Sequence, residues 1–192
     1  MEVSREYLRL LRLVVFAGAM GDKSDVIGYE DVTIDDALAA LKEAGLIEHD
    51  GFIAPTPLGV QAVDDWYARD RQGLSEADKR ALIAQFRPLD LEIKRLASAW
   101  QDATARDDWD GRLASIEALT SLHAKAMTFV DHFAAAVPRF AEFQRRLEHA
   151  ISLVLDGETD FFVGVRCDSY HTVWFHFHED LLRLVQRDRD RE

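Results

Sequence analysis

The residues with the most distinctive chemistry in this sequence lie near its C-terminal end, in the segment Cys167–Asp180, which contains three histidines. His171 and His178 are seven residues apart, so they share one face of a helix, whereas His176 points elsewhere. Asp168 and His171 are three residues apart and could meet one ion, but His178 lies about 10 Å further along a helix axis. One metal ion therefore cannot bind both histidines without a ligand from another helix.

No established catalytic motif accompanies these histidines. The sequence contains no P-loop, no GxGxxG, no HExxH, no GxSxG and no pair of cysteines at zinc-binding spacing. The single cysteine, Cys167, lies four residues before His171, near a predicted helix start where a thiolate would be stabilised. We expect no cofactor, no bound metal and no catalysis by this chain alone. A metal-dependent enzyme that uses the C-terminal histidines is the last of three functional hypotheses.

His123 is a second candidate, because it falls on the apolar side of its predicted helix. It is either a core histidine satisfied by a hydrogen bond or a residue that faces a cavity. Pockets in helical bundles are lined by aromatic side chains with a few polar groups, although such aromatic stripes more often form plain core. The cavity alternative predicts a site for a small aromatic or organic ligand, formed by Trp100, His123, Tyr170, His171, Trp174 and His178.

Four predicted helices carry these residues. They begin at Ser75, at about Trp109, at Pro138 and near Asp168, with a loop or short helix over 158–167. The buried side of the first is expected to be Leu82, Phe86, Leu89, Ile93, Leu96 and Trp100, at heptad-like spacing. Pro88 should kink this helix or break it near Arg87. Four apolar seams of matching length predict an antiparallel four-helix bundle over 75–187, followed by a frayed tail over 188–192.

Residues 1–72 predict a separate, winged helix-turn-helix-like domain with a short β-hairpin, so the whole chain is expected to be mainly α. The predicted elements are a helix over 3–19, a turn of helix over 25–28, a helix from Thr33 to Gly45, a hairpin over 47–53 and a helix from Thr56-Pro57 to about Arg71. The Asp50-Gly51 pair is a strong hairpin signal. Val60, Val63 and Tyr67 should form the buried face of the last helix.

Part of this domain resembles a known fold family. The stretch Ala39–Ile47, continued through Thr56-Pro57-Leu58-Gly59, resembles the second core helix and the wing of MarR-like winged-helix proteins. The resemblance covers about residues 4–70. It implies the fold, and it is weak evidence for function.

The charge pattern disfavours DNA binding by this domain. The net charge is −12, and residues 1–72 contain 7 Lys and Arg against 14 Asp and Glu. Asp35 and Asp36 lie in the first turn of the helix that would read DNA, although carboxylates there also favour the helix dipole. We therefore expect docking on another protein. A ligand-responsive transcriptional regulator is the alternative, and it requires a basic edge formed by Arg5, Arg9, Arg12 and Lys23.

The second half resembles a further group of proteins. The segments Phe86–Leu89, Trp100-Gln101, Asp168–Phe175 and His178–Leu182 are similar to those of small actinobacterial-type proteins in which a winged-helix-like unit precedes a helical bundle. Members are linked to pyruvate phosphate dikinase-like, phosphoenolpyruvate-utilising phosphotransferases as appended segments or neighbours, and others are called transcriptional regulators. The resemblance implies a non-catalytic accessory or regulatory subunit, and it transfers no catalytic residue to this chain.

The amino-acid composition restricts where in the cell this protein is expected. No apolar run approaches the roughly 20 residues that a membrane helix needs, and Arg12 interrupts the longest N-terminal one. A lone cysteine cannot form an internal disulfide, which fits a reducing compartment. We expect a cytoplasmic protein without membrane contact, whose partner is a larger protein or a second copy of itself.

Overall fold

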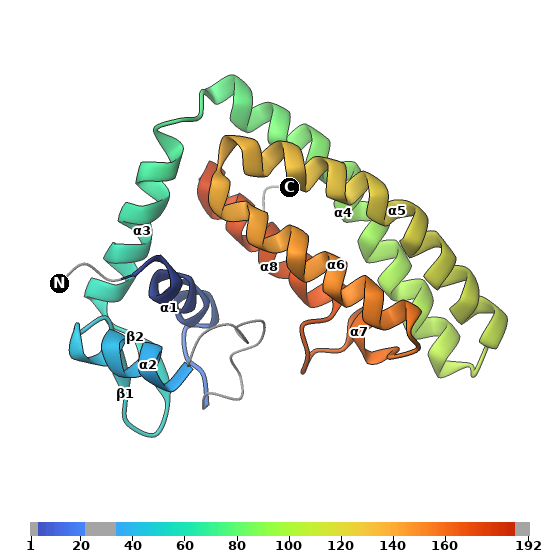
Figure 1. Ribbon diagram of the computed structural model, residues 1–192, viewed down its shortest axis with the longest axis horizontal. Helices are drawn as coiled ribbons and strands as arrows, with labels where there is room; N and C mark the ends of the chain where they lie inside the picture. The colour runs from blue at the N-terminus through green and yellow to red at the C-terminus, as the bar shows by residue number, and fades with distance from the viewer. Residues whose placement is uncertain (1–3, 22–33, 187–192) are drawn as a thin grey trace. The chain divides into compact units, whose positions relative to one another are not determined.

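The computed structural model describes residues 4–21 and 34–186, apart from the side chains of Arg5 and Glu6 (Figure 1). Within these residues the protein is mainly helical, with eight α-helices, one short 3-10 helix and a two-stranded antiparallel hairpin. The predicted mainly α class with a short hairpin is thus confirmed. The chain divides into two compact units, Met1–Asp70 (unit 1) and Arg71–Glu192 (unit 2). No helix in the described ranges is long and apolar enough to cross a membrane.

Unit 1 combines three helices with the hairpin. Its elements are α1 (Arg5–Ala17), α2 (Ile34–Glu43), β1 (Ile47–His49), β2 (Ile53–Pro55) and α3 (Pro57–Arg71), the last of which reaches the unit boundary. Glu48 lies opposite Ala54 in the ladder, and Met20 extends it by a bridge to Ile53. Gly51 in the connecting turn has φ of 87°, a conformation that favours glycine. The predicted Asp-Gly hairpin is therefore present.

Thr56 fixes the start of α3 against the end of α2. Its Oγ1 accepts the Gly59 N–H at 3.1 Å and donates to the Gly45 carbonyl at 2.6 Å. A Cβ on Gly59 would lie 2.0 Å from the Leu46 carbonyl oxygen, so only glycine allows this close approach. Thr56 therefore caps α3, and the predicted start of this helix at Thr56-Pro57 is confirmed.

The core of unit 1 contains apolar side chains from all of its elements. The fully or nearly fully buried ones include Leu10, Leu11, Val14, Leu38, Leu41, Ile47, Ile53, Val63 and Tyr67. Arg12 is also buried, and its guanidinium carbon lies 6.0 Å from the Trp66 ring centroid and 5.9 Å from that of Phe16. The prediction that Val60 belongs to the buried face is wrong, because 37% of it is exposed.

Several predictions concern residues that the structure does not describe. The turn of helix over 25–28, the helix start at Thr33, the basic position Lys23 and the tail over 188–192 all lie outside the described residues.

Unit 2 consists of packed helices. Its elements are α4 (Glu76–Ala105), α5 (Trp109–Ala136), the 3-10 helix η2 (Pro138–Phe140), α6 (Ala141–Leu155), α7 (Asp160–Val163) and α8 (Tyr170–Val185). α4 packs along α5, α5 along α6, and α8 lies against both α4 and α6 (Figure 1). Ser75 and Asp78 form a capping box at the predicted start of α4, and Asp108 and Ser169 cap α5 and α8.

α4 departs from its predicted pattern at two neighbouring positions. The helix continues through Pro88, so the predicted break near Arg87 is wrong. Leu89, expected on the buried side, is only half-buried, and Asp90 takes the buried position instead. Charged residues are almost never fully buried unless they are paired, which is why the sequence pattern favoured leucine here.

The interior of unit 2 is a continuous aromatic cluster centred on Phe177 of α8. Its ring centroid lies 5.1–6.0 Å from those of Phe86, Phe129, Phe133, Phe140, Phe143 and Trp174. Aromatic pairs at such distances contribute about 0.5–1.5 kcal/mol each beyond the area that they bury. The cluster therefore joins α4, α5, η2, α6 and α8 into one core.

Candidate functional site

The six predicted ligand-binding residues separate into three groups in unit 2. Trp174, His178 and His171 lie around Asp90, His123 pairs with Tyr170, and Trp100 belongs to a third location. All the groups involve helices α4, α5, α7 or α8. They are treated below in that order.

The first group is a buried polar cluster centred on the Asp90 carboxylate. Trp174 donates its indole N–H to Oδ1 at 3.1 Å, and Nδ1 of His178 lies 3.5 Å from the same oxygen. Oδ2 binds the Lys94 ammonium at 2.6 Å. Trp174 and His178 are almost completely buried, whereas half of the Lys94 side chain is exposed. Lys94 therefore connects the buried carboxylate to the exposed surface of the unit.

His171 is half-buried and lies close enough to Lys94 and Asp90 for both charges to act on it. Burial lowers the pKa of His171, and the positive charge of Lys94 lowers it further, while the negative charge of Asp90 acts in the opposite direction. The neutral imidazole is thus favoured. A neutral imidazole can donate one hydrogen bond to a ligand through its N–H and accept one through its other nitrogen.

The second group is the pair of His123 on α5 and Tyr170 on α8. His123 Nδ1 lies 3.2 Å from the Tyr170 hydroxyl oxygen, and the two rings meet edge to face. Burial lowers the pKa of His123, opposed by the negative charge of Glu148, and burial raises the pKa of Tyr170. Both groups are therefore neutral near pH 7. The hydrogen bond that one of the two alternatives for His123 requires is present, and the His123 side chain is half-buried.

Trp100 belongs to the third location. Its ring stacks on Phe162 of α7, with centroids 4.7 Å apart and planes 7° from parallel. It follows Asp90 by ten residues on α4, which is roughly 15 Å along a helix axis. Trp100 is buried, so its contacts fasten α7 to the end of α4.

Comparisons with known proteins leave the family open. No family model matches this chain, and no curated protein or solved structure matches it either. The two resemblances drawn from the sequence therefore stay predictions.

The arrangement of the acidic and metal-binding side chains does not favour a metal site. Within residues 4–21 and 34–186, no three or more His, Cys, Asp and Glu side chains are placed to hold an ion. Asp168, whose spacing suggested an ion shared with His171, is instead bound by Arg146 through two bonds of 2.6 and 2.8 Å.

The surroundings of Cys167 oppose a thiolate. Burial raises the pKa of this thiol, and the charges of Asp160 and Asp168 raise it further. The thiol faces the carbonyl oxygens of Asp160 and Gly164, at 3.5 and 3.8 Å.

Sequence reasoning missed the buried charges. Arg146 also lies 3.0 Å from Nδ1 of His176, and Arg139 binds both carboxylate oxygens of Asp180 at 2.7 Å. Asp90 and Asp180 each lie among apolar residues of an amphipathic helix. A charged residue at such a position is the signal that would have identified them.

The surface of unit 1 carries the charge on which the functional interpretation depends. Asp35, Asp36, Glu48 and Asp50 are exposed on α2 and the hairpin. Lys42 near the end of α2 binds Asp50 at 3.0 Å and the His49 carbonyl at 2.9 Å. We call the four exposed carboxylates, Asp35, Asp36, Glu48 and Asp50, the acidic face.

Proposed function

We propose that this protein is a non-catalytic accessory or regulatory subunit, and that its N-terminal unit is a winged helix that docks on a partner protein. The observation that carries the proposal is the exposed acidic face of α2 and the hairpin. The order of α1, α2, hairpin and α3 supports the winged helix, and the packing of α4, α5, α6 and α8 supports a four-helix bundle.

The charge of unit 1 favours a protein over DNA as its binding partner. A winged helix that binds DNA presents basic side chains to phosphates, and each phosphate contact contributes to affinity by releasing counterions. Here Asp35 and Asp36 occupy the first turn of α2, and Lys42 is already engaged by the hairpin. A cationic protein surface is complementary to this face, whereas a phosphate backbone is repelled by it.

The basic edge that a DNA-binding regulator requires is also incomplete. Arg12, one of the four arginine and lysine positions predicted for it, is buried against Trp66. A buried guanidinium cannot contact phosphates on a duplex. This supports the accessory subunit over the ligand-responsive regulator.

The sequence resemblance suggests which partner to test, and the acidic face suggests which residues to change. We propose a phosphoenolpyruvate-utilising phosphotransferase as the first partner to test, because the sequence resemblance implies it. Cross-linking in the native cell, followed by mass spectrometry, should recover one larger partner with the native chain. The double variant Asp35→Lys, Asp36→Lys should lose it.

The matched control is Asp64→Lys, Asp65→Lys. These residues are exposed on α3 in the same unit, so the variant changes the net charge equally and should keep the partner. Retention of the partner by the α2 variant contradicts docking through this face. Salt-dependent binding of the native chain to DNA from upstream of its own gene, measured by fluorescence anisotropy, would establish the regulator instead.

A further inference from the structure

An exposed apolar pair stands at the corner between α4 and α5, in unit 2. Trp109 is 69% exposed and Leu113 is 46% exposed. They are four residues apart on α5, so they lie next to one another on one helix face. The described residues include all four tryptophans, and the other three, Trp66, Trp100 and Trp174, are buried. Tryptophan is enriched at protein interfaces and among the residues that contribute most to binding, so an exposed indole beside a leucine is a candidate anchor.

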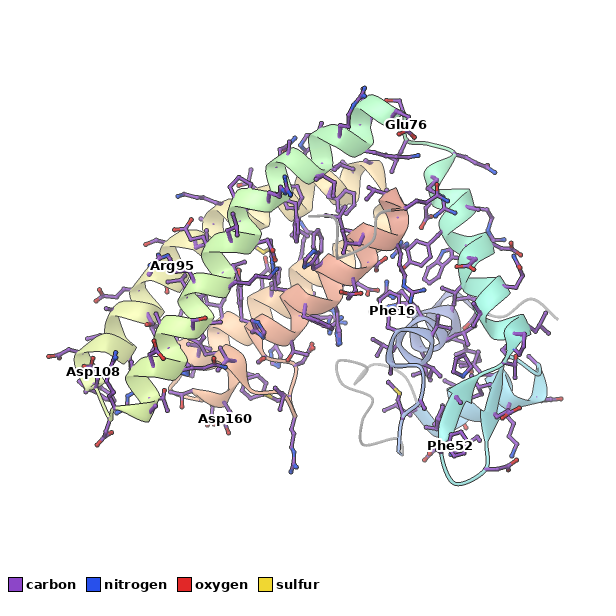
Figure 2. The ribbon with its side chains drawn as sticks, turned by 180° about the vertical axis from the view of Figure 1, so that it is seen from behind. Phe16, Phe52, Glu76, Arg95, Asp108 and Asp160 are labelled. Atoms are coloured by element: carbon purple, nitrogen blue, oxygen red, sulfur yellow. The ribbon has the colours of Figure 1, made fainter. Side chains whose placement is uncertain are left out.

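The corner that presents Trp109 is tightly built (Figure 2 labels Asp108 there). Asp108 caps α5 by accepting the Gly111 N–H at 2.9 Å, and its own N–H donates to the Ala103 carbonyl of α4 at 2.9 Å. A Cβ on Gly111 would lie 2.5 Å from the Asp108 carboxylate and 3.1 Å from the Ala103 Cβ. The first turn of α5 is therefore held close to the last turn of α4.

The indole itself is held by a charged neighbour. The Arg112 guanidinium carbon lies 5.4 Å from the Trp109 ring centroid, within the range of a cation–π interaction. Arg112 is positioned in turn by an ion pair with Asp107 at 3.1 Å. Restricting a side chain before binding lowers the entropy lost on binding, which is typical of an interface anchor.

The charges around the pair define what can cover it. Residues 102–117 contain the acidic residues Asp102, Asp107, Asp108, Asp110 and Glu117, against the basic residues Arg106 and Arg112. Arg112 is already paired with Asp107, which leaves a predominantly acidic rim. A second copy of this patch would bring acidic rims together, and an anionic membrane would be repelled in the same way. A cationic partner is complementary.

We propose that Trp109 and Leu113 anchor a docking site for a cationic amphipathic helix of a partner protein. Apolar residues of that helix cover the indole and the leucine, and its Lys or Arg side chains face Asp110 and Glu117. This surface is distinct from the acidic face of unit 1.

Tryptophan fluorescence of the full chain tests the proposal directly, because acrylamide quenches exposed indoles preferentially. The probe is a designed helical peptide of Leu and Lys at amphipathic spacing, and its control is the same design with Glu in place of Lys. The Leu/Lys peptide should protect the native chain from quenching, increasingly as salt is lowered. The Leu/Glu peptide should give no protection.

Variants locate the binding site. By calorimetry, Trp109→Ala should weaken binding of the Leu/Lys peptide about tenfold or more, the effect typical of an anchor residue. Leu91→Ala, which removes a side chain of similar exposure (68%) from α4, should leave the affinity unchanged. The circular dichroism of both variants should match that of the native chain.

Three outcomes would overturn the proposal. One is no binding of the Leu/Lys peptide at low salt. Another is equal affinity of native chain and Trp109→Ala, which would place the peptide elsewhere, for example on the acidic face of unit 1. The third is equal protection of the indole by the Leu/Glu peptide or by vesicles of anionic lipid.

Discussion

The indole of Trp174 donates its N–H to the Asp90 carboxylate across 3.1 Å and so ties α8 to α4 inside unit 2. The same carboxylate binds Lys94 and lies beside His178. Removing it would leave a buried indole N–H and a lysine without their acceptor, and unmet buried donors are costly. The Asp90 cluster is therefore a structural element first, and its contribution can be tested by stability measurements.

Asp90→Ala should lower the free energy of unfolding by about 2–4 kcal/mol, because it removes the partner of buried polar groups. Asp90→Asn keeps an oxygen that can accept the Trp174 N–H, so this variant should lose less of the free energy of unfolding. Urea denaturation followed by circular dichroism measures both. Asp102→Ala, at an exposed position of the same helix, is the control and should change the free energy by less than about 0.5 kcal/mol. Equal effects of the Ala and Asn variants would contradict the role of the indole bond.

Arg146 and Asp168 should be energetically coupled, because their two hydrogen bonds form in a largely buried setting. A double-mutant cycle with Arg146→Ala and Asp168→Ala should give a coupling of about 1–3 kcal/mol. The comparison is the Lys79–Glu76 pair, in which Glu76 is largely exposed. Its cycle should give a much smaller coupling, because solvent screens an exposed pair. Similar coupling in the two cycles would show that burial does not strengthen the Arg146 pair.

The pKa of His123 predicts a loss of stability in acid. Burial lowers this pKa below 6.5 in the folded chain, so the unfolded chain binds the proton more readily. The contribution of neutral His123 is complete above pH 6.5 and is lost as the pH falls toward the folded pKa. His171, whose pKa is also lowered, acts in the same direction.

The test compares urea midpoints of native chain and variants between pH 7.5 and pH 5. The decrease over this range should be smaller for His123→Gln than for the native chain. His132→Gln, at an exposed position of the same helix, should follow the native curve. An NMR titration that places the His123 pKa above 6.5 would refute the expected sign.

Gly59→Ala should destabilise unit 1 severely, because the added Cβ would lie 2.0 Å from the Leu46 carbonyl oxygen, a backbone atom that cannot move aside cheaply. We expect a loss of about 2 kcal/mol or more in the free energy of unfolding. Gln61→Ala, on an exposed position of the same helix, is the control. Thermal melts that show no difference between the two variants would contradict the close approach of α3 to Leu46.

The local elements of this protein were predictable from neighbouring residues. The Ser75–Asp78 capping box, the start of α5 at Trp109 and the hairpin at Asp50-Gly51 all depend on signals within a few positions. Such signals act through backbone hydrogen bonds and turn conformations that need no distant partner. The start of α5 places His123 on that helix.

Pro88 and Cys167 are two positions at which local rules were insufficient. α4 packs along α5 and α8, and this packing accompanies a continuous helix despite the proline. Burial raises the pKa of Cys167, and the charges of Asp160 in α7 and of Asp168 before α8 raise it further, which opposes the effect of a helix start. In the case of Pro88 the packed helices accompany a structure that the local preference of proline disfavours.

By itself, the sequence determined the mainly α class, the hairpin, most of the apolar faces and the acidic character of the α2 surface. Only the tertiary structure decided that Asp90 is buried with Trp174, 84 residues away, and that the six predicted site residues separate into three groups. The physical reason is that helix and turn formation depend on nearest neighbours along the chain. The burial of a charge depends instead on partners that only the packed fold brings within hydrogen-bond distance.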